Sequence, residues 1–297
     1  MNEINKHRVI IIINPISGVR HKNLNDYKRI VESTLDLDYF IPECFVTEYA
    51  GHAVEISTRG LASGVRYFLV AGGDGTVNEV ASLLTGTDAV MGILPAGSGN
   101  GLAHHLEIPG RIAEAVSVIN KRKIIAIDTC LVNDVFFVSI AGIGFDAKVA
   151  RQFARSKRRG FMTYAGIVFK EYFQYKPGEY LLRLDGKKIK TTAFFISFAN
   201  SSQFGYNTRI APGASITDGL IDVCIVKKPP VGALLRITHL LMRRRIDQSR
   251  YLEIIPASSI YVKRKKGKRV NVDGEAVIMK KELNVEIRPA SLKMLVP

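Results

Sequence analysis

The sequence predicts two domains: a three-layer α/β domain with a parallel sheet, followed by a domain built mainly of antiparallel β-strands. Three observations support this prediction. The chain has 297 residues, of which 47% are hydrophobic, and this is enough for two separate cores. From residue 8 to about residue 128, short apolar runs alternate with amphipathic helical patterns, as in α/β proteins. Further along, apolar runs follow one another through tight turns, as in antiparallel sheets.

The α/β pattern begins with residues 8–14, RVIIIIN, a continuous apolar run that is typical of a strand buried on both faces. Apolar residues then recur at the spacing of a helix, at Leu24, Tyr27, Ile30, Val31 and Leu35. The same reasoning predicts further strands at 44–47, 65–71 and 90–95, and further helices at 52–63, 77–84 and 112–120.

The β-rich pattern begins with two strands that are joined by a turn at Asn133-Asp134. A basic helical stretch follows at 146–175, and Asp185-Gly186 has the composition of a hairpin turn. Strands are expected within 123–133, 135–142, 179–200, 219–226, 258–277 and 291–297, and one more helix at about 230–246.

Three glycine-containing loops follow strands of the predicted parallel sheet. Residues 13–21 read INPISGVRH, residues 69–84 read LVAGGDGTVNEVASLL, and residues 94–106 read LPAGSGNGLAHHL. Glycine lets backbone N–H groups come close to phosphate oxygens, and the start of a helix attracts anions. Because such loops lie at the carboxyl ends of parallel strands, they predict a phosphate-binding site. Neither GxxxxGK[ST] nor GxGxxG occurs in them, which disfavours P-loop NTPases and ordinary dinucleotide-binding dehydrogenases.

The formal net charge of +15 favours anionic partners. Basic residues cluster at 155–159, 242–250 and 262–269. No pattern of a nucleic-acid-binding module occurs, so we expect nucleotide and an anionic membrane surface as partners, and no nucleic acid. The N-terminus is unlike a signal peptide, no apolar run is long enough to span a membrane, and the three cysteines lack a CxxC spacing. We therefore expect a cytoplasmic protein, peripherally associated with the membrane.

Six segments together resemble the diacylglycerol kinase catalytic-domain family, which includes bacterial lipid kinases, diacylglycerol kinases, sphingosine kinases and ceramide kinases. They occur in the family's order and span residues 14 to 277. The segments are NPISG (14–18), GGDGTVNEV (72–80), LPAGSGNGLA (94–103), AGIGFDAKVA (141–150), IAPGASITDGLIDV (210–223) and VNVDGEAV (270–277). The resemblance implies an enzyme that transfers the γ-phosphoryl group of ATP, with Mg²⁺, to a lipid hydroxyl.

The resemblance also implies a division of labour along the chain. Residues 1–128 would form an ATP-binding domain, completed by a C-terminal strand at 290–297. Residues 129–289 would form a lipid-substrate domain, a mainly antiparallel β-sandwich. Carried over residue by residue, the nucleotide contacts would be Asn14, Pro15, Ser17, Gly18, Thr47, Gly72, Gly73, Asp74, Gly75, Thr76, Val77, Asn78, Ser98 and Asn100.

The acidic residues take three roles in the family pattern. Asp74 would reach the catalytic Mg²⁺, which accepts one or two carboxylates together with phosphate oxygens. Asp218 would bind a structural Mg²⁺ with the backbone carbonyls of Ser215 and Leu220. Asp273 or Glu275 would accept the proton of the lipid hydroxyl; the pattern favours Glu275 slightly. On the residues alone, Asp218-Gly219 and Asp273-Gly274 are simple turns.

One loop departs from the pattern of bacterial diacylglycerol kinases. Those enzymes usually carry Gly-Thr-x-Asn-Asp with Arg three residues further on, whereas this chain has Gly97-Ser98-Gly99-Asn100-Gly101 with His104 in the Arg position. The loop is closer to that of sphingosine kinases. The acceptor is therefore expected to be diacylglycerol, a sphingoid base or a related lipid alcohol.

Two alternative functions and the oligomeric state remain open at this point. GGDGT also occurs in NAD kinases, although the long β-rich part of this chain fits the lipid kinases better. A catalytically silent protein that binds nucleotide or lipid is the other alternative; the retained acidic residues argue against it. A homodimer is possible.

Overall fold

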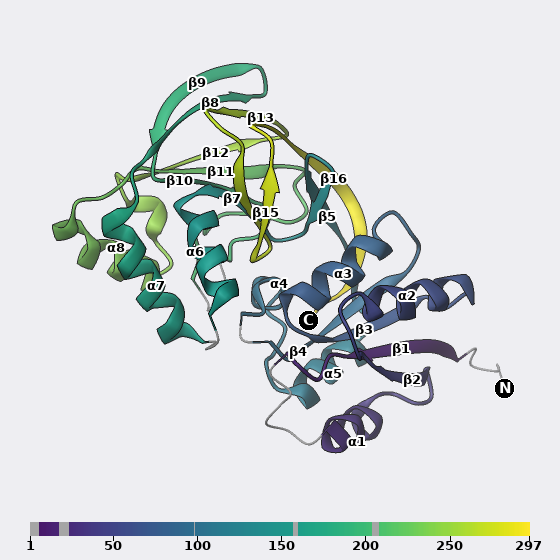
Figure 1. The fold of residues 1–297 in the computed structure, drawn as a ribbon. Helices are drawn as coiled ribbons and strands as arrows, with labels where there is room; N and C mark the ends of the chain where they lie inside the picture. Colours follow the sequence, from purple (N-terminus) through teal and green to yellow (C-terminus); the bar gives the residue numbers. More distant parts are fainter. Residues whose placement is uncertain (1–5, 18–23, 98, 157–159, 204–207) are drawn as a thin grey trace. The chain divides into compact units, whose positions relative to one another are not determined.

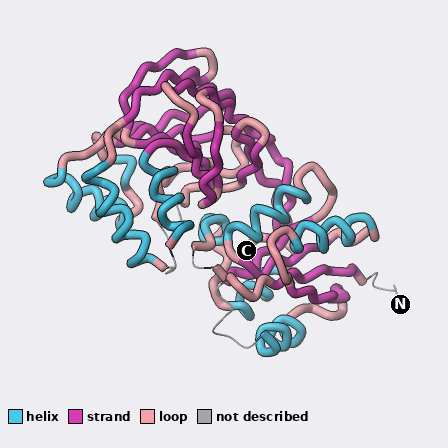
Figure 2. Tube along the Cα trace, in the orientation of Figure 1, coloured by secondary structure: helices cyan, strands magenta, loops and turns pink. Residues whose placement is uncertain are grey.

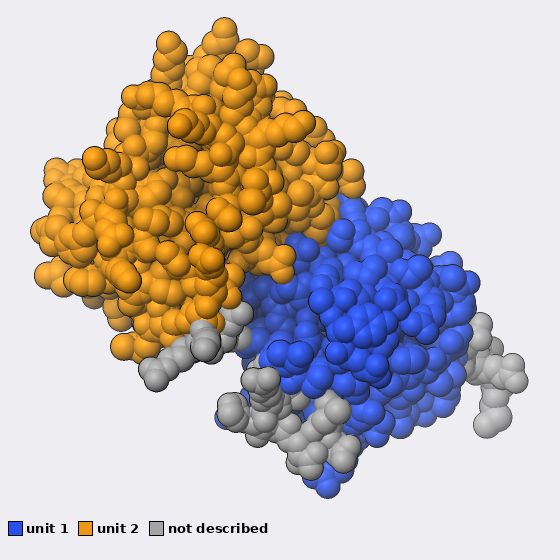
Figure 3. Space-filling view, viewed as in Figure 1, with its two compact units in different colours: residues 1–127, 290–297 blue, residues 128–289 orange. Residues whose placement is uncertain are grey.

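The computed structural model describes residues 6–17, 24–97, 99–156, 160–203 and 208–297. The chain divides into two compact units, residues 1–127 with 290–297, and residues 128–289, which are coloured separately in Figure 3. The predicted fold class is confirmed: the first unit is an α/β domain with parallel strands, and the second is built on antiparallel sheets (Figures 1 and 2).

The first unit contains a parallel sheet in the order β2-β1-β3-β4-β16. Helices α2 and α3, which contact each other, cover one face, and α1 and α5 cover the other (Figure 1). The elements are β1 (His7–Ile13), α1 (Leu24–Thr34), β2 (Phe40–Val46), α2 (His52–Ala62), β3 (Tyr67–Gly72), α3 (Asp74–Leu84), β4 (Val90–Pro95), α4 (Gly101–His105) and α5 (Ile112–Asn120).

The interior of this sheet explains why its strands are continuously apolar. In β1, Val9 and Ile11 to Ile13 are completely buried, because helices cover both faces of the strand. In α3, Val77, Val80 and Leu84 are buried at helical spacing against β3 and β4. Packing of this kind fixes the ends of β1, β3 and β4, from which the glycine-containing loops emerge.

The second unit is a sandwich of two sheets. One contains β16-β13-β8-β9 with β5 and β6, and the other has the order β12-β11-β10-β7-β14-β15. The strands are β5 (Ile124–Val132), β6 (Val135–Phe137), β7 (Ile140–Gly144), β8 (Gly178–Leu184), β9 (Lys187–Ala193), β10 (Phe195–Ala199), β11 (Ile221–Val226), β12 (Leu252–Ala257), β13 (Ser259–Arg264), β14 (Lys268–Val272), β15 (Glu275–Met279) and β16 (Glu282–Leu295). The hydrophobic core between the sheets takes side chains from both of them, such as Leu182 and Val262 from the first and Ile196 and Val223 from the second.

Helices lie outside this sandwich. Helix α6 (Phe145–Arg155) packs on β7, β10, β14 and β15 and contacts α7 (Phe161–Gln174). Two short helices, η2 (Val231–Ala233) and η3 (Ile246–Gln248), flank α8 (Leu234–Met242). None of the helices in the described ranges has the length and apolar character that a membrane span requires.

The last strand begins earlier than the expected C-terminal strand at 290–297, although residues 290–297 do belong to the first unit. β16 begins at Glu282, and its first residues pair with β13 in the second unit. Its last residues pair with β4, with Lys293 opposite Val90. The buried positions change spacing at Ala290, which has a positive φ of 48°, so the alternation that would reveal one long strand is interrupted.

Candidate functional site

The three glycine-containing loops leave neighbouring strands of the parallel sheet. β1, β3 and β4 are consecutive in the sheet order, and each loop begins at the carboxyl end of its strand. Ligands of parallel α/β sheets bind at this edge. The backbone links the loops directly, since the N–H of Asn14 donates to the carbonyl of Ala71 at 2.8 Å and the N–H of Ala96 donates to that of Gly72 at 3.2 Å.

Asn14 fastens the first loop to the start of α3. Its Nδ2 donates to Oγ1 of Thr76 at 2.8 Å, and its Oδ1 accepts the N–H of Ile16 at 3.0 Å. Ser17 closes the turn by donating its hydroxyl to the Asn14 carbonyl at 3.0 Å. Asn14, Ser17 and Thr76 therefore belong to one hydrogen-bonded unit beside the second loop.

Asp74 fastens the second loop to the third. As the first residue of α3, it accepts the backbone N–H of Gly101 on Oδ1 at 2.6 Å. Burial raises the pKa of the Asp74 carboxyl, while the N–H groups of Gly101 and Asn100 and the charge of His104 act in the opposite direction. The carboxylate is thus partly desolvated and is held by backbone donors.

Glycine is required in the third loop because the chains pass so close to each other. A Cβ atom on Gly97 would lie 2.5 Å from Cα of Gly73, and one on Gly99 would lie 2.6 Å from Oδ2 of Asp74. Asn100 adopts a left-handed conformation with φ of 50°, and its side chain bonds both the N–H and the carbonyl of Gly97. The two loops form a bare backbone surface with one carboxylate in it.

The N-terminus of α3 points its first N–H groups toward this edge. Its cap residue, Gly73, has an extended conformation and makes no side-chain cap hydrogen bond. The first turn of a helix has N–H groups without intrahelical acceptors, and the helix dipole adds positive potential there. Phosphate oxygens are suitable acceptors for such groups.

Some predicted nucleotide contacts have other surroundings. Val77 is buried in the core, and its N–H donates to the carbonyl of Gly73 at 3.1 Å, so its side chain is part of the packing of α3. Thr47 follows β2, is mostly buried, and donates its N–H to the Ile13 carbonyl at 2.9 Å. The remaining predicted contacts divide as follows: Pro15, Gly72, Gly75 and Asn78 lie in or beside the loops, and Gly18 and Ser98 fall outside the described residues.

In the second unit, the two candidate bases have different environments. Asp273 adopts a left-handed conformation with φ of 45°. Its two carboxylate oxygens accept the backbone N–H groups of Val138, Ser139 and Ile140 at 2.8, 3.0 and 2.8 Å. Glu275, two residues further on, is exposed at the start of β15. Asp273 therefore holds the turn, and Glu275 is the carboxylate that solvent reaches.

A buried polar pair that the sequence did not reveal supports the same hairpin. Asp146, near the start of α6, accepts a hydrogen bond on Oδ2 from Nδ2 of Asn271 in β14 at 2.9 Å. Burial raises the pKa of Asp146 to about 6. The other side of Asn271 accepts the N–H of Gly274 through Oδ1 at 3.0 Å. Asp146 lies within a family-like segment, but no local pattern shows what it contacts.

The segment 215–220 forms a loop that contains the exposed acid Asp218 and contacts the buried Asp128 of β5. Asp218 accepts the N–H of Leu220 on Oδ1 at 3.1 Å, and Ser215 accepts the N–H of Thr217 at 3.3 Å. Asp128, which the sequence analysis did not select, is buried and accepts the N–H of Gly219 at 2.8 Å. Its signal in the sequence was an acid inside the apolar run IIAIDTCLV.

The donor sets in the two units suit different ligands. Among the described residues there is no group of three or more His, Cys, Asp and Glu side chains that could hold a metal ion. A cation near Asp74 would therefore need phosphate oxygens, as Mg²⁺ bound with a nucleotide has. Near Asp218 it would need backbone carbonyls. There the negative charge of Asp218 adds to burial in raising the pKa of Asp222, and a cation would relieve this repulsion.

Two family models match this chain, one in each half. Residues 8–132 match the diacylglycerol kinase catalytic domain, and residues 139–296 match the YegS C-terminal NAD kinase beta sandwich-like domain. A diacylglycerol kinase of Bacillus subtilis is 25% identical over 275 residues, covering 90% of this chain and 89% of the relative. A probable lipid kinase, YegS-like, of Pseudomonas putida is 27% identical, covering 85% and 84% of the two chains.

The fold has a solved counterpart. A crystal structure of a diacylglycerol kinase from Bacillus anthracis aligns with a TM-score of 0.77 over 99% of this chain and 98% of that one, at 20% sequence identity. At this identity the likeness concerns the fold alone.

Proposed function

The chain belongs to the diacylglycerol kinase and YegS-like lipid kinase family, and we propose that it transfers the γ-phosphoryl group of ATP to a hydroxyl group of a lipid, with Mg²⁺. The observation that carries this proposal is the loop pair joined by Asp74. The partly buried carboxylate of Asp74 lies at the start of a helix and is surrounded by the backbone of glycine residues. Phosphoryl transfer needs positioned phosphates and positive charge more than covalent chemistry.

In this proposal, the first unit holds the nucleotide. N–H groups at the start of α3 and in the loop after β4 would donate to phosphate oxygens. The hydrogen bond between Asn14 and Thr76 would keep the first loop beside them. When bound, Mg²⁺ would neutralise part of the charge on the transferred phosphoryl group. Asp74 would be the carboxylate that faces this ion, with Oδ1 oriented by Gly101.

The second unit would supply the base and the lipid contacts. We assign the base to Glu275, because Asp273 is occupied by three backbone donors. A positioned carboxylate that accepts the proton of an alcohol contributes roughly 10²–10⁴-fold to the rate. The loop 215–220, with Asp218 and the carbonyls of Ser215 and Leu220, would hold a second, structural Mg²⁺.

The acceptor and the setting of the reaction are part of the proposal. We propose a lipid alcohol such as diacylglycerol or a sphingoid base, met at an anionic membrane surface by a peripheral, cytoplasmic enzyme that is monomeric or a homodimer. The net charge of +15 supports the anionic surface.

The direct test is a transfer assay with labelled ATP and Mg²⁺. The acceptors are diacylglycerol, a sphingoid base and a monoalkyl glycerol, each in neutral detergent micelles, and NAD in solution. We expect label in at least one lipid and none in NAD. Label in NAD alone would identify an NAD kinase. Binding of ATP without transfer to any acceptor would identify a silent relative.

A further inference from the structure

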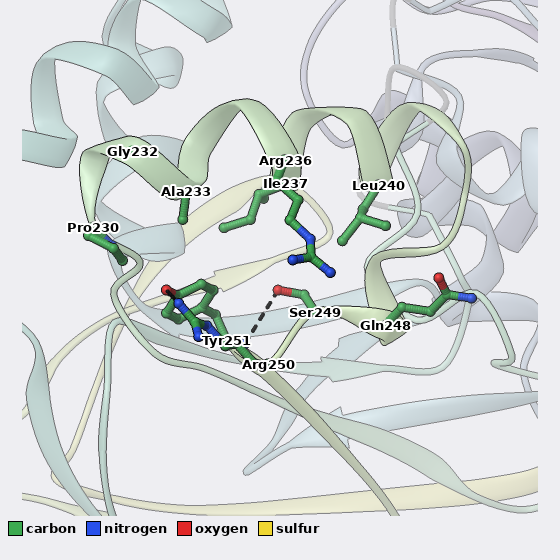
Figure 4. A pocket seen from close by; sticks show the side chains of 10 residues that line it. All are labelled: Pro230, Gly232, Ala233, Arg236, Ile237, Leu240, Gln248, Ser249, Arg250 and Tyr251. Atoms are coloured by element: carbon green, nitrogen blue, oxygen red, sulfur yellow. Dashed lines mark hydrogen bonds between the residues drawn. The ribbon is translucent and has the colours of Figure 1, made fainter.

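A cavity in the second unit contains none of the residues that we assign to phosphoryl transfer. It has a volume of about 370 Å³ and lies between η2 with α8 and the segment Gln248–Tyr251 (Figure 4). Four residues at helical spacing, Ala233, Arg236, Ile237 and Leu240, form the helix side of the cavity. The opposite wall is polar.

The polar groups of this cavity are mostly hydrogen-bond donors. Arg236 extends from α8 into the cavity toward Ser249 (Figure 4). Arg250, on the opposite wall, donates to the hydroxyl of Tyr251 at 2.8 Å, and its guanidinium lies 5.1 Å from the centre of the Tyr251 ring. Ser249 is only 7% exposed; its oxygen accepts the N–H of Tyr251 at 3.3 Å, which leaves the hydroxyl proton to donate.

None of the described residues that line the cavity carries a carboxylate. Within the described part of the chain, the ion pairs found do not include Arg236 or Arg250. Two guanidinium groups and a hydroxyl on facing walls form a site for a phosphate, because guanidinium binds phosphate oxygens with paired, charge-assisted hydrogen bonds.

The exposed side of α8 indicates that the phosphate would belong to a membrane lipid. The helix is apolar, yet it has no buried residue. Leu235 is 85% exposed and Met242 is 81% exposed. Residues 227–253 around it carry seven basic side chains (Lys227, Lys228, Arg236, Arg243, Arg244, Arg245, Arg250) and two acidic ones (Asp247, Glu253). Exposed apolar side chains with a basic surround are typical of a helix that lies in the interface of an anionic membrane.

We propose that this cavity binds the phosphate of an anionic phospholipid headgroup while Leu235 and Met242 enter the acyl region of the same leaflet. The bound lipid is a membrane anchor, separate from the lipid that is phosphorylated. The inference rests on the proposed function only in giving the protein a reason to be at a membrane. Binding to lipid without ATP or acceptor tests it separately.

The experiment compares two pairs of substitutions that remove equal charge. Arg236→Gln with Arg250→Gln changes the cavity, and Arg243→Gln with Arg245→Gln changes exposed residues near the end of α8 that do not line it. Binding of the purified full chain is measured by flotation with vesicles of a neutral digalactosyl lipid, which carries no phosphate. One set contains phosphatidylglycerol, and a second contains a fatty acid, matched to the first in surface potential.

We expect the unchanged protein to bind the phosphatidylglycerol vesicles at least about tenfold more tightly than the fatty-acid vesicles, because a tetrahedral phosphate can present oxygens to both walls of the cavity, whereas a planar carboxylate directs its two oxygens at one guanidinium. The cavity pair should abolish this preference. The control pair should weaken binding to both vesicles equally, by roughly fivefold for each charge removed, and keep the preference. Thermal unfolding of both pairs should match that of the unchanged protein.

Three outcomes would overturn the inference. The first is a protein with no preference for phosphatidylglycerol. The second is an equal loss of preference in both pairs, which would leave only diffuse attraction. The third is inorganic phosphate that saturates the cavity while vesicle binding stays unchanged, which would identify a site for free phosphate. A protein that keeps the preference yet phosphorylates no lipid would contradict the proposed function alone.

Discussion

At the scale of single residues, acidic side chains divide by what their oxygens contact. Asp74 and Asp273 both accept backbone N–H groups, but Asp74 takes them from the neighbouring glycine loop, at Asn100 and Gly101, whereas Asp273 takes three from one segment. A carboxylate with both oxygens bonded to backbone N–H groups stabilises a turn, whereas one at the edge of a loop can still meet a ligand. Glu275 is exposed and has no such structural task in view.

Asp74→Asn should lower phosphoryl transfer by at least about 10²-fold, because a metal ion on a transferring phosphoryl group is worth several kcal/mol. The fold should persist, since an amide oxygen at this position can still accept the N–H of Gly101. The measurement is labelled transfer from ATP together with thermal unfolding. Glu114→Gln, which removes an exposed acid of α5, is the control and should be as active as the unchanged protein. Full activity in Asp74→Asn would remove Asp74 from the mechanism.

Glu275→Gln should mainly lower the rate of transfer, whereas Asp273→Asn should mainly lower the stability of the fold. We expect Glu275→Gln to lower kcat by roughly 10²–10⁴-fold with little change in unfolding. Asp273→Asn should lower the free energy of unfolding by about 2–4 kcal/mol, because an amide presents N–H groups to backbone donors that had charged acceptors. Urea unfolding and steady-state kinetics on both variants separate the two roles. A stable, inactive Asp273→Asn protein would transfer the role of base to Asp273.

Asp146 should make stability depend on pH. Its pKa of about 6 is higher than the ordinary aspartate value of 3.8, so the folded protein holds this proton more tightly than the unfolded chain does. The carboxyl therefore stabilises the folded state at low pH, and this contribution is lost as pH rises through 6. The amide of the Asp146→Asn variant does not titrate. The free energy of unfolding of this variant, relative to that of the unchanged protein, should therefore rise by roughly 2–3 kcal/mol between pH 4 and 7. Urea unfolding across this range measures the difference; a constant difference would refute the assignment.

At the scale of elements, the site depends on how closely two loops approach. The position for a Cβ on Gly97 is 2.5 Å from Cα of Gly73, a backbone atom that cannot move alone. The glycines therefore serve the packing of loop on loop as well as access to phosphate. This explains why two glycine-containing loops occur after neighbouring strands.

Gly97→Ala should separate these loops and weaken ATP binding more than tenfold, since misplacement by about 1 Å can cost 10²-fold in a positioned site. Gly110→Ala is the matched control, because a Cβ there meets nothing within 4 Å and its φ is not positive. Titration of each protein with ATP gives the two values of Kd. Equal affinities would show that the contact between Gly97 and Gly73 does not shape the nucleotide site.

Regular elements could be predicted from the sequence where burial has a simple period. The strand at 90–95 and the helix at 112–120 have the predicted bounds. β12 was missed because its residues are largely half-exposed and include Pro256, so neither alternation nor a continuous apolar run marks it. The pair of Asp146 and Asn271 joins residues 125 positions apart, and a contact of that range leaves no pattern in a single sequence.

The residues of the candidate site could likewise be predicted only where their signal is local in the sequence. Glycine loops, Asp74 and Asn14 are local signals at strand ends, and the structure brings them together. The different roles of Asp273 and Glu275 could not be predicted. They depend on the backbone N–H groups of Val138 to Ile140, which come close to Asp273 only in the folded chain. Asp128 is similar, since its partner Gly219 is 91 positions away.

At the scale of the whole molecule, one strand belongs to both units. β16 pairs with β13 near Glu282 and with β4 near its C-terminal end. Leu292, Met294 and Leu295 are buried in the first unit, although the residues before them belong to the second. The parallel sheet that carries the glycine loops is therefore completed by residues more than 190 positions beyond β4 in the chain.

Met294→Ala should consequently destabilise the first unit. Met294 is completely buried opposite Met91 of β4, and truncation of a core methionine to alanine costs about 2–5 kcal/mol. Hydrogen exchange of the β1 and β3 amides should accelerate, and ATP should protect them again by favouring the folded unit. Glu286→Ala, at an exposed position of the same strand, should change the free energy of unfolding by no more than about 0.5 kcal/mol. If exchange in β1 and β3 were as slow as in the unchanged protein, the end of β16 would not support the nucleotide-binding sheet, and the role of the C-terminal strand would have to be given up.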